Sequence, residues 1–176
     1  LPAYRIAGAF NTFRPETSTA YNLSDLRGYD ALAPQRYYRW WAHPGIGDLP
    51  PEAQGYLSKL ENPEHPAWQL LNFGYFLTAP DQPAPDGPFK LIDSPEDASI
   101  YQLTTIRPRA WVAVRAEISD TAQAVLDRIA NMEKAPFNPD EVVLIDKEVT
   151  ADAQRVIAPA DNDAERVKQD KAFWSS

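Results

Sequence analysis

The chain has 176 residues and a formal net charge of −8, and 44% of its residues are hydrophobic. This composition is typical of a globular domain, and the acidic balance argues against binding to nucleic acid or anionic lipid, which needs clustered Lys and Arg. The chain has no cysteine, which excludes disulfides, thiolate metal sites and a cysteine nucleophile. The longest apolar runs are about five residues, whereas a membrane span needs about 20. The chain begins with Leu rather than Met, and we expect a fragment or a processed form.

The first part of the chain predicts one strand and two helices. Residues 4–10 alternate weakly between faces, which predicts a strand. Residues 11–23 have the composition of a loop. Pro34 presets the backbone for a first helical turn, so we expect a helix over residues 34–41. Apolar residues at helical spacing predict another helix over residues 51–60.

The middle of the chain predicts three strands. Residues 66–71 indicate a short helical piece, and the aromatic residues 73–78 indicate a buried strand. The proline-rich residues 79–88 predict an exposed loop. Residues 89–93 and 98–103 predict a hairpin, because the Ser-Pro-Glu-Asp segment between them has Pro at the second turn position.

The last part predicts a strand, a helix and a strand. The strands are expected over residues 110–118 and 141–145. The helix is expected over residues 121–134, with Asp120 as its N-cap and Gln123 completing a capping box. This order permits a parallel pair of strands joined by a right-handed crossover.

These elements predict an α/β (α+β) fold with one domain, a mixed sheet of about five to six strands and about three short helices. We expect the domain to cover residues 1–158. Residues 159–176 are polar, and we expect a loosely ordered tail there.

Residues 25–41 carry the strongest functional signal, because they combine three arginines, two aspartates and five aromatic residues. Flat rings stack on sugar faces, and Arg and Asp side chains reach sugar hydroxyls, so the segment fits a sugar platform. The alternative is amphipathic packing, in which Tyr37, Trp40 and Trp41 are buried while Arg36 and Arg39 project outward. Of the two, we favour packing.

Metal and cofactor sites have little support in the sequence. His43 and His65 could form a metal site with Asp48 and Glu64, but their spacing matches no motif, and we expect ordinary loop histidines. The chain has no G-x-S-x-G, no phosphate loop and no G-x-G-x-x-G motif. We therefore expect no metal and no cofactor.

Paired carboxylates suit glycoside hydrolysis, and Asp25 with Asp30 is the best local pair. The simpler interpretation is that both aspartates cap turns or pair with Arg27 or Arg36. We favour the simpler interpretation.

Several segments, taken in order, resemble the YfhO-type bacterial membrane proteins. NLSDLRGYDAL followed by PQRYY resembles that family's RGYD…P-x-RY block, and LLNFGYFLT resembles its LLNVRYVLT strand. IY followed by RPRAW resembles its VYEN…LPRA segment, and residues 120–145 resemble the helix and strand that follow. The resemblance covers about residues 1–150. It departs at Gly74, where the family has a basic residue, and at residues 102–105, which replace the ENP turn.

The resemblance implies that the chain is the soluble, extracytoplasmic (periplasmic) part of a polytopic protein of the bacterial inner membrane. The family is similar to lipid-linked-sugar-dependent glycosyltransferases that act on the cell envelope. In such proteins the catalytic acid is expected in a loop between early membrane spans, so no catalytic residue is carried over to this chain. We expect an accessory or acceptor-recognition domain without its own catalytic centre.

The partners that the resemblance implies are the transmembrane part of the same polypeptide and a glycan or lipid-linked sugar, and no nucleic acid. An alternative is a free-standing periplasmic binding or scaffold domain. A third hypothesis is a secreted carbohydrate hydrolase that works through Asp25 and Asp30. The family block places the candidate binding residues at Arg27, Tyr29, Asp30, Arg36 and Tyr37.

Overall fold

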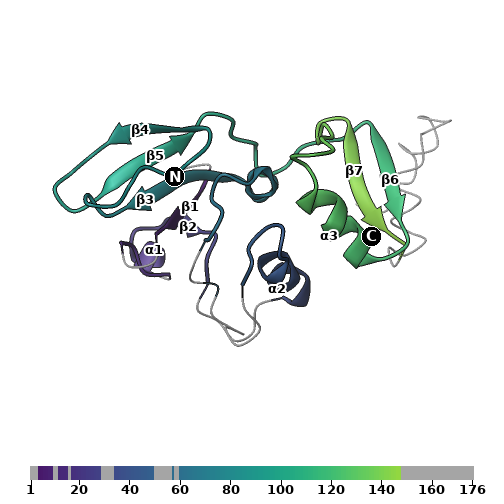
Figure 1. The fold of residues 1–176 in the computed structure, drawn as a ribbon, viewed down its shortest axis with the longest axis horizontal. Helices are drawn as coiled ribbons and strands as arrows, with labels where there is room; N and C mark the ends of the chain where they lie inside the picture. Colours follow the sequence, from purple (N-terminus) through teal and green to yellow (C-terminus); the bar gives the residue numbers. More distant parts are fainter. Residues whose placement is uncertain are drawn as a thin grey trace, which may run out of the picture.

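The computed structural model describes residues 4–9, 12–15, 17–28, 34–49, 57 and 60–147. Over these residues the fold is mixed α+β, as predicted, with a five-stranded sheet, a two-stranded sheet and four helices. The two sheets lie at opposite ends of the molecule (Figure 1). The predicted helix over residues 51–60 lies outside the described residues except at positions 57 and 60, and the predicted tail lies outside them entirely.

The larger sheet is mixed and has the strand order β2-β1-β3-β5-β4. The strand β1 pairs in parallel with β2 and β3, and β3, β5 and β4 pair antiparallel. The hairpin of β4 and β5 and the strand β3 confirm their predictions, whereas β1 is shorter than predicted and the helix α1 interrupts the predicted loop. The bounds are β1 (Arg5–Gly8), α1 (Thr17–Ala20), β2 (Ser24–Asp25), β3 (Phe73–Thr78), β4 (Phe89–Asp93) and β5 (Ser99–Leu103).

The smaller sheet belongs to a strand, helix and strand unit: β6 (Arg115–Ser119), α3 (Ala122–Ala130) and β7 (Val142–Asp146). The strands β6 and β7 pair in parallel over their whole length, the arrangement that the order of the predicted elements permits. The helix α3 ends earlier than predicted, at Ala130. Asn131 is its C-cap, and the side-chain amide and the backbone N–H of Asn131 both donate to the carbonyl of Asp127.

The predicted strand over residues 110–118 is wrong in its first half. Residues 110–114 belong to no strand, and β6 begins only at Arg115. Val112 and Val114 are 90% and 85% exposed. The apolar run therefore does not mark a buried strand here: the two valines are at the surface, and Trp111 and Ala113 are half-buried.

Two helices lie between the two sheets in space (Figure 1). The helix α2 (Gln35–Ala42) begins directly after Pro34, as predicted, and the 3-10 helix η2 (Pro66–Leu71) matches the predicted helical piece. The loop after α2 folds back onto the helix at Gly47, where an added Cβ would lie 2.3 Å from the carbonyl oxygen of Trp41. Only glycine fits such a close approach of two backbones.

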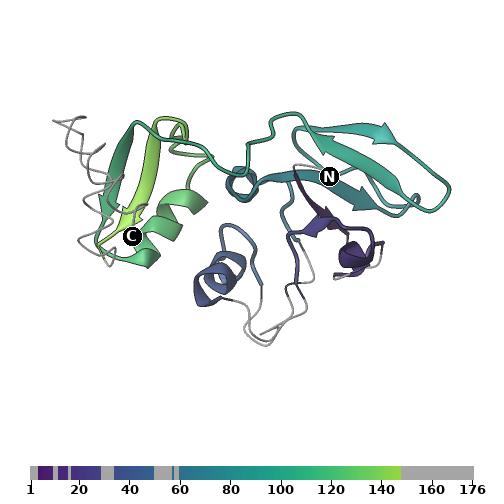
Figure 2. The same cartoon turned by 180° about the vertical axis from the view of Figure 1, so that it is seen from behind.

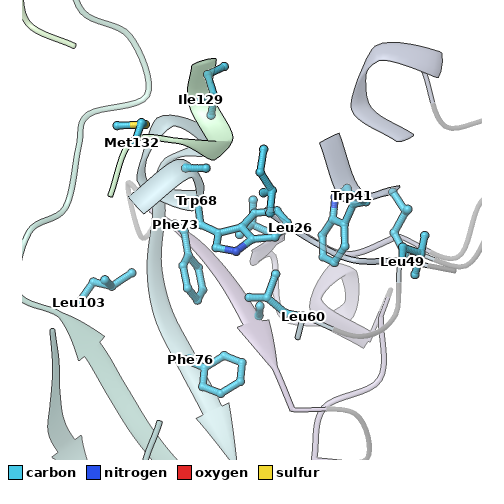
Figure 3. Packing of buried hydrophobic residues seen from close by; sticks show 14 of the residues in the cluster. Leu26, Trp41, Leu49, Leu60, Trp68, Phe73, Phe76, Leu103, Ile129 and Met132 are labelled. Atoms are coloured by element: carbon cyan, nitrogen blue, oxygen red, sulfur yellow. The ribbon is translucent and has the colours of Figure 1, made fainter. Parts of the chain in front are cut away.

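One hydrophobic core joins the two ends of the molecule. The rings of Trp41 in α2 and Trp68 in η2 lie 4.8 Å apart between their centroids, and Trp68 lies between Trp41 and Phe73 of β3 (Figure 3). Ile129 and Met132, from the C-terminal unit, belong to the same cluster. The helix α2 lies next to α3 in the front view (Figure 1) and in the view from behind (Figure 2). Among the described residues, no helix has the length and apolar character needed to cross a bilayer.

The guanidinium of Arg27 ties the first strands together. It donates to both carboxylate oxygens of Asp25, at 3.1 and 2.8 Å, to the carbonyl of Gly8 at 2.7 Å and to the carbonyl of Phe13 at 2.6 Å. The side chains of Arg27 and Asp25 are 0% and 4% exposed. Buried charges are tolerated only when paired and hydrogen-bonded in this way.

We predict that Arg27→Met destabilises the fold strongly, because it leaves the buried carboxylate of Asp25 without its cation and the carbonyls of Gly8 and Phe13 without the guanidinium donor. Breaking one side of a buried pair costs about 3–5 kcal/mol, and we expect a loss of that size in the free energy of unfolding measured with denaturant. Arg14→Gln, at an exposed position, is the matched control and should change it by less than about 0.5 kcal/mol. Similar unfolding curves for both variants would contradict a stabilising role of the Arg27 side chain.

The N-cap of α3 differs from the sequence prediction and can be tested. Thr121, not Asp120, accepts a hydrogen bond from the backbone N–H of Ala124, at 3.1 Å. Asp120 is one residue too early and forms an exposed ion pair with Lys147 instead. We predict that Thr121→Ala lowers the free energy of unfolding by about 1 kcal/mol, that Thr121→Ser restores it, and that Asp120→Ala has a smaller effect than Thr121→Ala. A larger loss of unfolding free energy in Asp120→Ala than in Thr121→Ala would instead identify Asp120 as the cap.

Candidate functional site

An apolar cavity of about 550 Å³ lies where η2 meets the C-terminal unit. Its walls come from α2, from the end of η2, from residues 110–113 and from the unit of α3 and β7. All of its lining side chains are aliphatic or aromatic. They include Trp40, Leu71, Trp111, Ile129, Phe137 and Leu144. The volume lies within the range of about 300–1,000 Å³ that is usual for ligand pockets.

Two of the rings in this wall are held by polar contacts on their outer sides. The indole N–H of Trp111 donates to the carbonyl of Pro139 at 2.7 Å, and the guanidinium of Arg107 lies 5.9 Å from the ring centroid of Trp111. The guanidinium of Arg128 lies 4.9 Å from the ring centroid of Phe137. Cation–π contacts of this kind hold a ring in place while its other face remains apolar.

A second, smaller cavity of about 160 Å³ lies between α2 and α3 and shares Trp40 and Ile129 with the first. Its α2 wall carries two cations, Arg36 and Arg39. Across it, Asp146 at the end of β7 pairs with Arg36 at 2.9 Å. Apolar residues of α3 complete the wall. The small cavity therefore differs from the large one in having charged side chains in an otherwise apolar lining.

Helix geometry places these residues together. Arg36, Arg39 and Trp40 are spaced three and four residues apart, so they share one face of α2. Trp41 follows Trp40 by about 100° around the helix, and it is completely buried in the core. Burial of Trp41 therefore directs the face of Trp40 and the arginines toward α3. The predicted burial is confirmed for Trp41, whereas Tyr37 and Trp40 are half-buried. Arg36 and Arg39 are exposed, as predicted.

The structure separates the candidate binding residues that the sequence grouped together. Arg36 lines the small cavity, whereas the side chain of Arg27 is buried in its ion pair with Asp25. The hydroxyl of Tyr37 donates to the carbonyl of Leu26, and burial raises the pKa of this phenol. Tyr29 and Asp30 lie outside the described residues. Ligand binding by these five residues stays a prediction, and among the described three Arg36 borders one of these two cavities.

The carboxylate of Asp25 is occupied by Arg27. This geometry fits the simpler interpretation, in which Asp25 pairs with an arginine, and it gives no support to hydrolysis through Asp25. Asp30, the other member of the predicted pair, lies outside the described residues.

Both histidines contact α3. The ring of His43 contacts Asp127 at 2.9 Å, and Nε2 of His65 lies 3.2 Å from the carbonyl oxygen of Ala130. The other ring nitrogen of His65, Nδ1, accepts from the N–H of Ala67 at the start of η2. Among the described residues no group of three His, Asp or Glu side chains could hold a metal ion. The histidines connect α3 to the rest of the molecule.

Sequence reasoning did not identify the large cavity. Its walls come from five separate stretches of the chain, and only tertiary packing brings Leu71, Trp111 and Phe137 together. The available signal was weak: Trp111 and Phe137 are aromatic residues in proline-containing segments, where a core residue is less expected.

The contact between His43 and Asp127 predicts a pH dependence. Hydrogen bonds from His43 and then from Gln123 hold the pKa of Asp127 below its ordinary value of 3.8. A carboxylate with a lowered pKa in the folded state stabilises the fold above the pKa of the unfolded chain, and this stabilisation is lost as the pH falls through the folded value. We predict that Asp127→Asn lowers Tm at pH 6, and that the difference from wild type shrinks below about pH 3.9. Thermal melts between pH 2.5 and 7 measure it, with Asp81→Asn as the exposed control. A difference that grew at acid pH would contradict the contact.

Comparison with protein-family models gives no match, and comparisons with curated proteins and with solved structures give none either. The resemblance to YfhO-type proteins therefore rests on the quoted segments alone. The segments contribute β2, α2, β3 and β5 to the fold. Membership of that family stays a prediction.

Proposed function

We propose that the chain is the extracytoplasmic domain of a polytopic membrane protein similar to lipid-linked-sugar-dependent glycosyltransferases. In this proposal the domain has an accessory or acceptor-recognition role, and it binds through the large cavity beside α2. The observation that carries the proposal is the apolar cavity of about 550 Å³ together with the small cavity beside it, which Arg36 and Arg39 line. The membrane context comes from the resemblance alone.

The cavity is suited to binding rather than to chemistry of its own. Its lining side chains are hydrocarbon chains and rings, with two indoles as the only polar groups. None of them titrates near neutral pH, so none can serve as a general acid or base there. In the proposed protein the catalytic acid would lie in the membrane-embedded part, and this domain would orient a substrate or the membrane part itself.

The departure from the family pattern at Gly74 has a local explanation. A Cβ built at Gly74 would lie 2.7 Å from the Cβ of Tyr4, so a longer side chain would require Tyr4 to move. The rings of Tyr4 and Tyr75 lie 6.3 Å apart between their centroids. Tyr4 thus occupies the space that a basic side chain would need, and the departure is compatible with the proposal.

The alternative of a free-standing periplasmic domain makes the same use of the cavity and differs only in context. The complete reading frame separates the two. Several apolar spans of about 20 residues favour the membrane protein, and a lone signal peptide favours the free-standing domain.

Filling the cavity in the full-length protein tests the proposed role. Ala113 lines the cavity and is half-buried, so Ala113→Trp places a ring in empty space. We predict that this variant reduces glycosyl transfer by the full-length protein in membrane vesicles at least about tenfold, which corresponds to about 1.4 kcal/mol of lost interaction. Ala98→Trp, in the β4–β5 turn, is the matched control and should transfer normally.

Equal protease resistance of both variants would show that the fold is retained. Normal transfer by a folded Ala113→Trp protein would refute a role of the cavity in transfer.

A further inference from the structure

We propose that the two cavities form one binding site for an amphipathic anion. Its apolar chain would lie in the large cavity, and its anionic group would lie in the small cavity against Arg39. The inference rests on the proposed function only in assuming that the large cavity holds a ligand. It does not depend on the membrane context.

The large cavity selects against a bare sugar. The N–H of Trp111 is already used by the carbonyl of Pro139, and the N–H of Trp40 is enclosed by protein atoms and faces no solvent. Neither indole therefore offers a donor to the cavity, and the other lining side chains have no polar group. Sugar hydroxyls placed there would lose their water without gaining partners, which is costly. A hydrocarbon chain loses nothing and gains burial.

The small cavity adds what the large one lacks, because charged groups stand beside its apolar residues. Its volume of about 160 Å³ equals that of about five water molecules at about 30 Å³ each. This space suits a compact group such as a carboxylate or a phosphate. Trp40 and Ile129 line both cavities, so the two cavities are neighbours, and in our proposal one molecule reaches across these two side chains.

The charges of the small cavity are unequal. Asp146 faces Arg36 in a 2.9 Å ion pair, which leaves Arg39 as the second cation. Arg39 is exposed and forms no ion pair with any residue that the structure describes. In a chain of net charge −8, anions are repelled from most of the surface, so an uncompensated guanidinium beside an apolar cavity is a selective position for one.

Titration of the 176-residue chain with decyl phosphate tests the inference. Decanol supplies the same chain without charge, decyltrimethylammonium reverses the charge, and inorganic phosphate lacks the chain. All are used below their micelle concentrations, with tryptophan fluorescence and calorimetry as readouts. We expect decyl phosphate to bind about tenfold more tightly than decanol, the effect of one charge-assisted hydrogen bond, and the other two probes to bind more weakly still. Decanoate as a further arm shows whether the site prefers a carboxylate or a phosphate, and tighter binding of either than of decanol supports the site.

Two variants assign the parts of the ligand to the cavities. Arg39→Gln should bring decyl phosphate to the affinity of decanol without changing decanol itself, and Arg14→Gln, at an exposed arginine outside both cavities, should change neither. Ala113→Trp should weaken both probes. Thermal melts of each variant establish that it is folded.

The anion site would be overturned if the wild-type chain bound neither decyl phosphate nor decanoate more tightly than decanol, or if Arg39→Gln kept the preference for the anion. Absence of decyl phosphate binding by the folded chain would overturn the whole inference. These measurements need no membrane, so they can fail independently of the proposed function. Conversely, tight binding of decyl phosphate together with normal transfer by the Ala113→Trp full-length protein would refute the proposed function alone.

Discussion

The contact between Trp41 and Trp68 is the constraint on which the arrangement of the molecule depends. Both side chains are fully buried, with ring centroids 4.8 Å apart, and together they fix α2 against η2. Aromatic side chains of this size dominate the energy of a core. Because Trp41 is anchored, its neighbour Trp40 lies on the side of the C-terminal unit, and Arg36, one turn before Trp40, and Arg39, directly before it, border the small cavity on that side. The position of the candidate site is thus a consequence of core packing.

Local chemistry predicted the elements that it controls. Pro34 marked the start of α2, the turn residues between β4 and β5 marked the hairpin, and the aromatic run marked β3. These signals act within a few residues and need no knowledge of the rest of the fold. The apolar residues 110–114 were misread for the same reason. A run of valines and alanines shows what could be buried, but burial depends on what packs against it, and here Val112 and Val114 remain exposed.

The role of Arg27 shows a second limit of sequence reasoning. Three guanidinium groups among aromatic rings suggested a surface, since charged side chains are rarely buried. Arg27 is buried nonetheless, because Asp25 is two residues away and two backbone carbonyls from β1 and the following loop lie within its reach. The pairing with Asp25 was among the alternatives that the sequence left open. The carbonyl partners were not, because they depend on how β1 and β2 pair.

The cavity exists because the two parts of the molecule are joined unevenly. Ile129 and Met132 enter the common core, and a few half-buried side chains such as Val125 and Phe137 pack against it. At the margins the junction has polar contacts, such as those of His43 with Asp127 and Arg36 with Asp146. Polar contacts fix a distance between surfaces without filling the space between them, whereas apolar side chains stabilise a junction only where they touch. The space beside Trp40 is bounded by both parts, so a molecule bound there would contact both. By linkage, such a molecule favours the joined arrangement as much as the joined arrangement favours its binding.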